Sequence, residues 1–316
     1  MGLYPKVTRN FEIDLPVGPY SNVYYVDAVN GSDGHDGLRP EKPFLTIEAA
    51  YAACTAGQHD TVVLISGTSG FTLTGALTWA KDYTHLVGMC APIAEGQRAR
   101  IFAPSAGEQP VLLTISATGC IFKDFYIFNG SAAAAALGNV LVTGERNYFE
   151  NVHFAGSGHA TNCVDGSYSL GLNGGGESLF KHCTFGLTSI AQPTGVRLVA
   201  LIGGYPPRVR FEDCFFGMHA SHAAACMVEG EDGAMMLEYM LFKDCVFFNE
   251  TDTAINTAFE IHTADATRQA ILLVNCMRSA GVDDWEDGSK DCVWVGGSPD
   301  MGAGTSMGDM IVATVA

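Results

Sequence analysis

The chain has 316 residues, of which 47% are hydrophobic and only 16% are charged, so it is long and apolar enough to bury a sizeable core. Its 34 acidic and 17 basic residues give a net charge of −17, which argues against binding of nucleic acid or anionic polysaccharide by bulk attraction. No apolar run approaches the roughly 18–20 residues of a membrane-spanning helix, and residues 1–10 lack the features of a signal peptide. We therefore expect no nucleic-acid partner and no membrane.

The first part of the chain predicts an extended arm followed by a cap. Residues 1–22 contain Pro5, Pro16 and Pro19 and are expected to form the arm. Residues 23–58 contain an apolar strand, a loop rich in Gly and Asp, and an Ala-rich helix. The helix should cover the open end of the structure that follows. Its apolar face is predicted to consist of Phe44, Ile47, Ala50, Tyr51 and Cys54.

A heptapeptide recurs through the middle of the chain. LFKHCTF at 179–185 returns as RFEDCFF at 210–216 and as LFKDCVF at 241–247, with fainter copies at 121–128, 148–154 and 272–277. Phe180, Phe211 and Phe242 are thus separated by 31 positions each. Repetition at 20–50 residues is typical of solenoids, propellers and arrays. Residues 59–280 are predicted to form one repetitive unit with 31-residue turns.

Each copy breaks the two-residue alternation of a β-strand at the same point. In the copy at 241–247, Phe242, Cys245 and Phe247 should all point inward, so the chain must bend between the first and second of them. Asn, Asp and His are the non-glycine residues that best tolerate positive φ. The equivalent position in all copies carries only these types: Asp124, Asn151, His182, Asp213, Asp244 and Asn275. We interpret this position as a corner that occurs once per turn.

The length and composition of the repeat favour one architecture over the others. The repeats are aromatic, β-branched and Gly-rich, which disfavours a helical solenoid, and a propeller blade needs four strands in roughly 40 residues. A 31-residue turn fits two or three short strands and a loop. The predicted fold is therefore all-β, a single-stranded parallel β-helix whose rungs lie about 4.8 Å apart.

The outward position before each corner carries charges whose sign alternates along the chain. If successive rungs lie side by side, each charge has an opposite neighbour, which contributes roughly 0.2–1 kcal/mol per pair. The residues are Lys123, Glu150, Lys181, Glu212 and Lys243.

The cysteines and the C-terminal segment complete the survey of the chain. Four of the ten cysteines fall at one point of the repeat, and none forms a C-x-x-C pair. A buried thiol packs as a small apolar group, so we expect free thiols and a reducing compartment. Residues 281–316 are expected to form a closing loop and an extended tail.

Two segments resemble a known fold family. VYYVDAVNGSDGHDGLRPEKPFLTIEAAYAAC at Val23–Cys54 and DTVVLISGT at Asp60–Thr68 resemble the opening of pectate-lyase-like right-handed β-helix proteins. With the repeats, the resemblance covers residues 23–279 and implies a right-handed coil. It implies little about function, because this fold includes lyases, hydrolases, epimerases and inert virion parts.

No constellation of residues predicts catalysis or metal binding. Asp213 and Asp244 could form a carboxylate pair but are better interpreted as stacked corners. Asp33 and Asp36 could ligate calcium, yet the loop lacks the bidentate Glu of an EF-hand. The motifs of polygalacturonase-like enzymes are absent from the sequence. We expect no catalytic, cofactor-binding or metal site.

Two further segments are interpreted as structural features and not as functional sites. His219, His222 and Cys226 have ligand-like spacing, but a contact between subunits or a plain loop is favoured over a metal site. The acidic segment 283–291 is interpreted as a solvated loop.

The favoured functional hypothesis is a non-catalytic structural protein of a phage virion, assembled in the host cytoplasm, because this chain resembles phage surface proteins of the same fold. The resemblance implies a homotrimer, with capsid or other virion proteins as partners and capsid decoration as the role. Small side chains at 131–138 and 221–226 would suit contacts between subunits, or merely line tight turns.

Two alternatives remain open. One is a polysaccharide lyase or hydrolase of the tailspike type. The other is a surface module that binds glycans without cleaving them, with Trp79, Tyr205 or Trp285 stacking on sugars.

Overall fold

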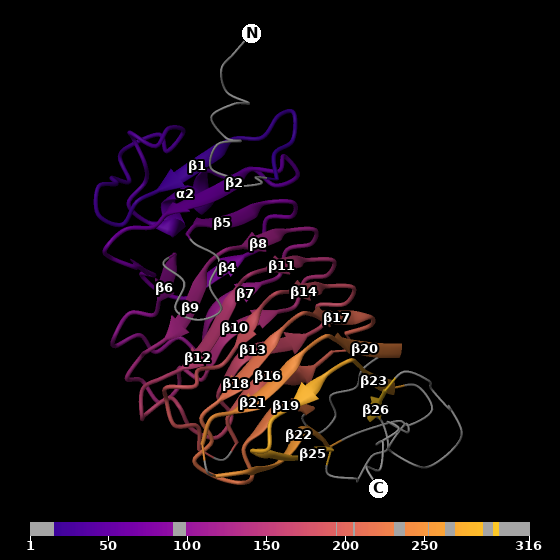
Figure 1. Ribbon diagram of the computed structural model, residues 1–316. Helices are drawn as coiled ribbons and strands as arrows, with labels where there is room; N and C mark the ends of the chain where they lie inside the picture. The colour runs from indigo at the N-terminus through magenta and orange to yellow at the C-terminus, as the bar shows by residue number, and fades with distance from the viewer. Residues whose placement is uncertain are drawn as a thin grey trace, which may run out of the picture.

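The chain winds into a right-handed parallel β-helix (Figure 1). The computed structural model describes residues 16–90, 99–193, 195–204, 206–230, 238–251, 253–262, 269–286 and 293–296. From Thr61 onward, each complete turn contributes one strand to each of three parallel sheets, whereas the first two strands of the chain both belong to one sheet. The predicted fold class is confirmed.

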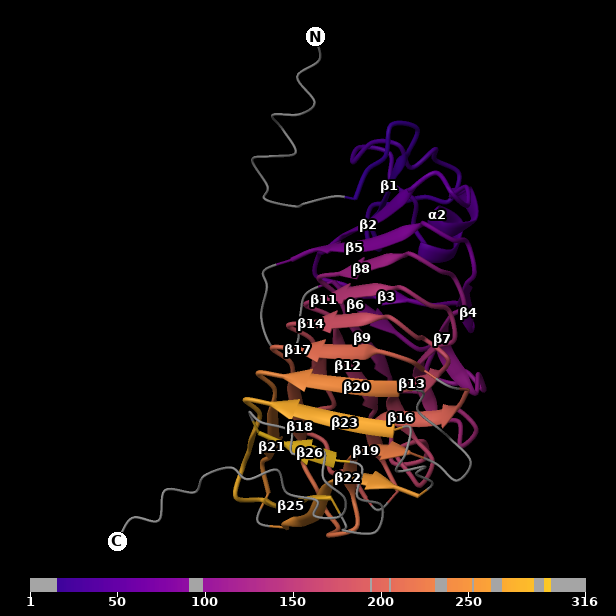
Figure 2. The ribbon, with the colours of Figure 1, turned by 90° about the vertical axis from the view of Figure 1, so that its right-hand side faces the viewer.

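The three sheets are named in the order in which a turn visits them. Sheet A contains β1 (Val23–Val26), β2 (Thr61–Ile65), β5 (His85–Met89), β8 (Ile121–Lys123), β11 (Tyr148–Glu150), β14 (Leu179–Lys181), β17 (Val209–Glu212), β20 (Glu238–Lys243), β23 (Gln269–Val274) and β26 (Val293–Val295). Sheet B contains β3 (Phe71–Thr72), β6 (Arg100–Phe102), β9 (Tyr126–Asn129), β12 (His153–Ser157), β15 (Thr184–Phe185), β18 (Phe215–Met218), β21 (Val246–Asn249) and β24 (Met277–Arg278). Sheet C contains β4 (Leu77–Trp79), β7 (Val111–Ile115), β10 (Gly138–Val142), β13 (Tyr168–Asn173), β16 (Arg197–Gly203), β19 (Cys226–Gly230), β22 (Ile255–Ile261) and β25 (Val282–Glu286). Figure 2 shows the strands of sheet A from β5 to β23 one below another along the rod.

Two columns of phenylalanine rings run through the interior. Phe149, Phe180, Phe211 and Phe242 stack from sheet A with centroids 4.5, 4.8 and 4.6 Å apart. A second column from sheet B has spacings of 5.1, 4.8 and 4.5 Å and consists of Phe154, Phe185, Phe216 and Phe247. All eight side chains are buried, and full burial of each stabilises the fold by about 1.5–3 kcal/mol. The 31-residue period therefore places equivalent rings directly above one another.

The corner between sheets A and B has the predicted backbone conformation at every repeat. A left-handed residue bends the strand, so that the side chains on both sides of the corner point inward. The positive φ values are 59° at Asp124, 51° at Asn151, 52° at His182, 52° at Asp213, 56° at Asp244 and 52° at Asn275.

The helix α2 (Ile47–Ala53) closes the N-terminal end of the coil (Figure 1). Thr46 caps it by accepting a hydrogen bond from the Ala49 N–H at 3.2 Å, as Thr does at helix N-termini. Tyr51 packs on Trp79 with ring centroids 4.3 Å apart. Ile47, Ala50 and Tyr51 form its buried face as predicted. Phe44 and Cys54 are also buried but lie outside the helix, before its N-cap and at its C-cap. None of the described helices is long and apolar enough to cross a membrane.

The coil continues beyond residue 280, where we expected only a closing loop and tail. β25 and β26 add strands to sheets C and A. Trp285 in β25 lies against Phe247 with ring centroids 5.4 Å apart, and Val282 and Val293 are buried. Apolar side chains at these positions extend the core by part of another turn. Residues 297–316, in the predicted tail, lie outside the described residues.

The predicted N-terminal arm is described from residue 16 onward. The Thr61 hydroxyl donates to the Pro16 carbonyl at 2.9 Å, and the Asn22 N–H donates to Asp60 at 2.6 Å. This end of the arm is therefore attached to the first turn of the coil, and residues 1–15 lie outside the described part of the chain.

The nine described cysteines are free thiols. The repeat cysteines each donate to the carbonyl of the phenylalanine one turn earlier. Cys214, for example, lies 3.4 Å from the Phe180 oxygen, and Cys245 lies 3.5 Å from that of Phe211. Burial raises the pKa of the Cys214 thiol well above its usual range. The repeat thiols act as packing groups, and its raised pKa makes the Cys214 thiol a poor nucleophile.

Candidate functional site on sheet C

A cluster of charged side chains lies on the outer face of sheet C. Glu229 of β19 and Glu260 of β22 are in register on adjacent strands, so both side chains leave the sheet side by side. Arg197 begins β16, the strand on the other side of β19, and His262 directly follows β22. The parallel coil thus brings together two carboxylates, a guanidinium and an imidazole from three successive turns.

Hydrogen bonds connect the cluster through one carboxylate. Arg197 donates to Glu229 from two nitrogens, with Nη2 3.0 Å from Oε1. His262 Nε2 lies 3.1 Å from the same Glu229 oxygen and 3.6 Å from Glu260 Oε1. The side chains of Arg197 and Glu229 are 11% and 9% exposed, whereas those of His262 and Glu260 are 38% and 34% exposed. A buried ion pair therefore lies behind two groups that solvent can reach.

This arrangement limits the chemistry that the cluster can perform. Glu229 is neutralised by Arg197 and largely shielded, so it is poorly placed to attack a substrate. His262 and Glu260 can exchange protons or hydrogen-bond a ligand. Nearby Cys226 is buried, and burial raises its thiol pKa well above the usual range, which makes it a poor nucleophile. In the described part of the chain no group of three or more His, Cys, Asp or Glu residues could hold a metal ion.

The sequence analysis did not single out these four residues. Glu229 and Glu260 are 31 residues apart, so the repeat length was a signal that could have paired them. Arg197 lies 32 residues before Glu229 and is out of step with that period. Its position depends on the loop lengths of its own turn.

The corner aspartates have structural partners. Asp213 lies 3.5 Å from His182, and Asp244 accepts a hydrogen bond from Asn275 at 2.5 Å. Asp124 accepts likewise from Asn151 at 2.7 Å. The Asp213 and Asp244 side chains therefore stabilise the corner column, in line with their interpretation as stacked corners.

The carboxylates of the Gly/Asp loop hold the loop and the helix cap. Asp33 accepts from the N–H groups of Leu45 and Thr46, both at 2.9 Å, and from the Thr46 hydroxyl at 3.0 Å. Asp36 accepts from the Leu38 N–H at 3.2 Å. Their oxygens therefore have structural hydrogen-bond partners.

The histidines considered as metal ligands face different groups. His219 Nδ1 lies 3.0 Å from the Thr188 carbonyl, and His222 Nδ1 accepts from the Ala224 N–H at 3.1 Å. Cys226 lies 3.9 Å from Glu229. The spacing seen in the sequence thus reflects three separate local contacts.

The structure describes Trp79 and Trp285, two of the residues considered for sugar stacking, and part of the predicted acidic loop. Trp79 is buried, so it cannot stack on a sugar, and Trp285 packs into the end of the core. Tyr205 lies outside the described residues. Asp283 and Asp284 are exposed within β25, whereas residues 287–291 of the predicted acidic loop are not described.

The alternating charges on sheet A are stacked in register, as predicted. Lys123 and Glu150 form an ion pair at 2.8 Å. Glu212, however, pairs with Arg210 on its own strand. The stacking is confirmed, but the expected cross-strand pairing holds for the first pair and is replaced at Glu212, because a nearer guanidinium is available there.

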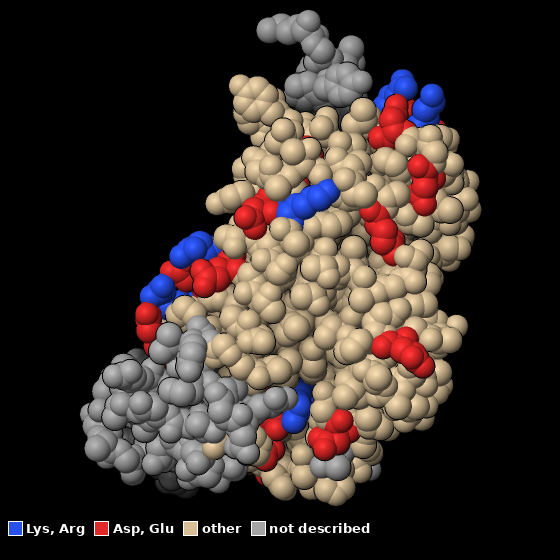
Figure 3. All heavy atoms as spheres, turned by 180° about the vertical axis from the view of Figure 1, so that it is seen from behind, with Lys and Arg blue, Asp and Glu red and all other residues tan. Residues whose placement is uncertain are grey.

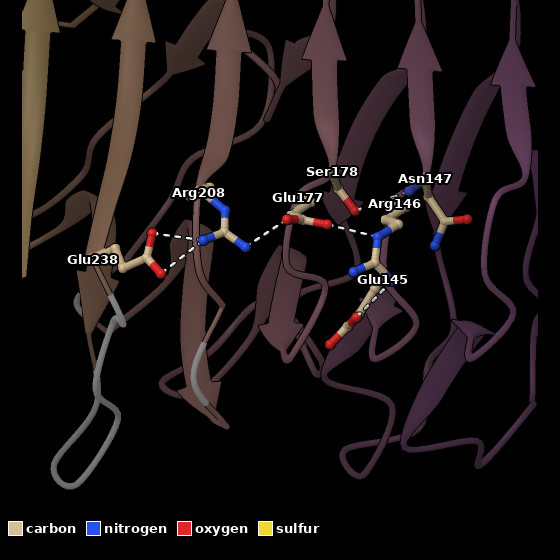
Figure 4. Close-up of polar contacts among 7 residues, drawn as sticks. All are labelled: Glu145, Arg146, Asn147, Glu177, Ser178, Arg208 and Glu238. Atoms are coloured by element: carbon tan, nitrogen blue, oxygen red, sulfur yellow. Dashed lines mark hydrogen bonds and ion pairs between the residues drawn. The ribbon is translucent and has the colours of Figure 1, made fainter.

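A second charged row, which the sequence analysis missed, marks the entrance to sheet A (Figure 4). Arg208 contacts Glu177 at 2.5 Å on one side and Glu238 at 2.7 Å on the other, and Arg146 contacts Glu177 at 2.6 Å. All four residues have positive φ, between 53° and 70°. They form a second column of left-handed corners whose charges alternate. Figure 3 shows charges of both signs along one edge of a largely uncharged face.

Comparisons with known proteins identify the fold. No protein-family model and no curated protein sequence matches the chain. Pectin methylesterase PemA from Erwinia chrysanthemi is 16% identical, with 83% of this chain and 80% of that chain covered and a TM-score of 0.54. A rhamnogalacturonan lyase is 14% identical, with 81% and 68% covered and a TM-score of 0.53. ORF18 of Geobacillus virus E2 gives a TM-score of 0.46 with 50% of its chain covered, which is too low to carry an argument.

The chain has the right-handed parallel β-helix fold of the pectate-lyase-like proteins, as the sequence resemblance implied. At these identities the similarity concerns the fold. Because this fold supports many activities, function has to be argued from the side chains.

Proposed function

We propose that this chain is a non-catalytic structural protein of a phage virion, a trimer that decorates the capsid. The observation that carries the proposal is the engagement of carboxylates in the molecule's own scaffold. Glu229, Asp33, Asp124 and Asp244 each accept hydrogen bonds from groups of the same chain, and Asp213 lies 3.5 Å from His182. Groups held in this way stabilise a surface and are poorly suited to proton transfer.

The stacked core also supports the proposal. In-register rungs, two columns of phenylalanine and a capped end make a stiff rod. Stacked aromatic pairs add about 0.5–1.5 kcal/mol each beyond area burial. A stiff rod with rows of alternating charges along sheet A suits a protein that has to persist on the outside of a particle.

Purified particles test the virion role, and purified protein tests the oligomer. We expect the chain to sediment as a stable trimer and to copurify with intact capsids in many copies per particle. Incubation with capsular or pectic polymers should release no reducing ends and no 4,5-unsaturated products. Absence from purified particles would contradict the virion role, and sustained turnover would contradict the non-catalytic role.

A second candidate function rests on the Glu229–Glu260 pair. The two strands are adjacent, and retaining glycosidases use two carboxyl groups about 5–5.5 Å apart. Because Glu229 is held by Arg197, Glu260 is the carboxylate of this pair that solvent can reach. In this alternative, a polysaccharide hydrolase or lyase of the tailspike type, Glu260 and His262 would contact the sugar. Glu260→Gln should then abolish product release, while Glu250→Gln, at an exposed position after β21, should leave it unchanged.

A further inference from the structure

The outer face of sheet B carries aromatic and aliphatic side chains. Phe102, Tyr126, Phe128, Leu187 and Ile190 belong to an apolar cluster separate from the main core. Nearer the C-terminal end, Phe215 and Phe248 lie with ring centroids 6.1 Å apart. Phe248 is 37% exposed and Met277 is 63% exposed. Several aromatic side chains are thus present on both faces of this sheet.

Strand register arranges these side chains into two columns that run along the rod. The first contains Arg100, Tyr126, His153, Thr184, Phe215, Val246 and Met277. The second has two stretches, one of Phe102, Phe128 and Gly156 and one of Gly217 and Phe248.

Charge is nearly absent from these columns. Arg100, at their N-terminal end, carries the one permanent charge among these residues. His153 is neutral at physiological pH, because burial lowers its pKa to about 4.

Glycines keep this face flat. A Cβ at Gly217 would lie 2.5 Å from Cε1 of Phe215, and one at Gly158 would lie 2.2 Å from Cζ of Phe128. The aromatic rings therefore lie over backbone where any side chain would collide with them. Tyr126, His153 and Thr184 are buried within the chain itself, whereas Phe248 and Met277, nearer the C-terminal end, are exposed. Exposed apolar patches on a folded protein mark interaction sites.

Symmetry and charge decide which partner suits this face. In a trimer of parallel rods, a residue near the threefold axis lies closest to copies of itself. The outer charges of sheet A and the Glu229–Glu260 pair of sheet C would each meet two like charges there, which is repulsive. A chain of net charge −17 avoids this repulsion where its surface is uncharged.

We propose that the outer face of sheet B faces the threefold axis and packs against the same face of two further copies of this chain. The inference rests on the trimer proposed above and names its interface. The small-residue segment 131–138 would then lie beside the contact rather than at its centre, since it connects β9 of sheet B to β10 of sheet C.

Charged substitutions test this face against another with the same exposure. Phe248→Glu and Met277→Glu place a carboxylate on sheet B, whereas Val274→Glu places one on the outer face of sheet A, where Val274 is also 37% exposed. In sedimentation velocity, the two sheet B variants should dissociate at least about tenfold more readily than the unchanged chain. Val274→Glu should remain trimeric, and circular dichroism should confirm that all variants are folded.

Three results would overturn the inference, and they can be told apart. If both sheet B variants remain as trimeric as the unchanged chain, the interface lies elsewhere and the trimer stands. If Val274→Glu dissociates equally, the face has no special role. If the unchanged chain is a monomer, the interface and the trimer are both wrong, whereas copurification with capsids still tests the virion role independently.

Discussion

At the scale of single residues, the direction of a side chain decides its importance in this coil. Phe211 and Glu212 are neighbours in β17, yet the first lies between two other rings in the core and the second lies on the outer face of the sheet. Inward positions have neighbours above, below and across the core, whereas outward positions have solvent on one side.

Substitution of this neighbouring pair gives opposite expected results. Phe211→Asp should abolish folding, because it buries a charge without a partner among the phenylalanine columns. Glu212→Lys should lower the free energy of unfolding by no more than about 1 kcal/mol, since its ion pair is at the surface. Urea unfolding followed by circular dichroism measures both. Equal tolerance of the two changes would show that the inward and outward assignments are wrong.

A buried histidine should make stability depend on pH. His153 is buried in sheet B, its Nε2 lies 2.7 Å from the Gly186 carbonyl, and desolvation lowers its pKa to about 4. Between pH of about 6.5 and 4 the unfolded chain binds a proton that the folded chain does not. The free energy of unfolding should therefore fall as the pH drops through this window.

The variant His153→Gln isolates this contribution. It cannot titrate, so its unfolding free energy should fall less steeply from pH 6.5 to pH 4 than that of the unchanged chain. The exposed His222→Gln serves as a control and should keep the original slope. Identical slopes for all three proteins would contradict the prediction.

At the scale of elements, the cap depends on tertiary contacts as well as on the helix itself. α2 has only seven residues, and isolated helices shorter than about 12–15 residues are marginal in water. Its attachment comes from Tyr51, whose hydroxyl accepts from the N–H groups of Ala80 and Lys81 at 2.6 and 2.9 Å. Lys81 in turn donates from Nζ to the carbonyl of Cys54 at 2.6 Å, just beyond the end of the helix.

Removal of one hydroxyl tests this attachment. Tyr51→Phe should lower the free energy of unfolding by about 1–3 kcal/mol, because the N–H groups of Ala80 and Lys81 lose their acceptor. Tyr20→Phe is the matched control, since Tyr20 is 83% exposed, and should change stability by less than about 0.5 kcal/mol. Thermal and urea unfolding provide the comparison, and equal stabilities would rule out a role for Tyr51 in holding the cap.

At the scale of the whole molecule, stability should vary along the rod. Each turn contacts only the turns next to it, so stability is roughly a sum of nearest-neighbour terms. Turns in the middle are supported on both sides, while those at the ends are supported on one.

Hydrogen exchange followed by mass spectrometry measures this gradient. Backbone amides of β14 and β17 should exchange most slowly, and those of β24 and β25 at the C-terminal end should exchange faster. Uniform protection along the coil, or fastest exchange in its centre, would show that the molecule does not behave as a stack of turns.

The sequence alone determined the repeat, the corners and the cap. These features depend on local rules that recur at a fixed spacing: Asn, Asp or His at a left-handed corner, Phe directed inward on either side of it, and an apolar helix face. Because parallel rungs stack in register, a period in the sequence becomes a column in space.

The tertiary structure alone decided the positions that this period does not fix. Loops between the sheets differ in length, so Arg197 meets Glu229 at a spacing outside the repeat. The continuation of the coil into β25 and β26 and the burial of Trp79 were likewise visible only in the structure. The aromatic outer face of sheet B was equally hidden in the sequence, because apolar residues on both sides of a strand leave no alternation that separates inside from outside. That separation required knowledge of which sheet each strand joins and which side of the sheet faces the core.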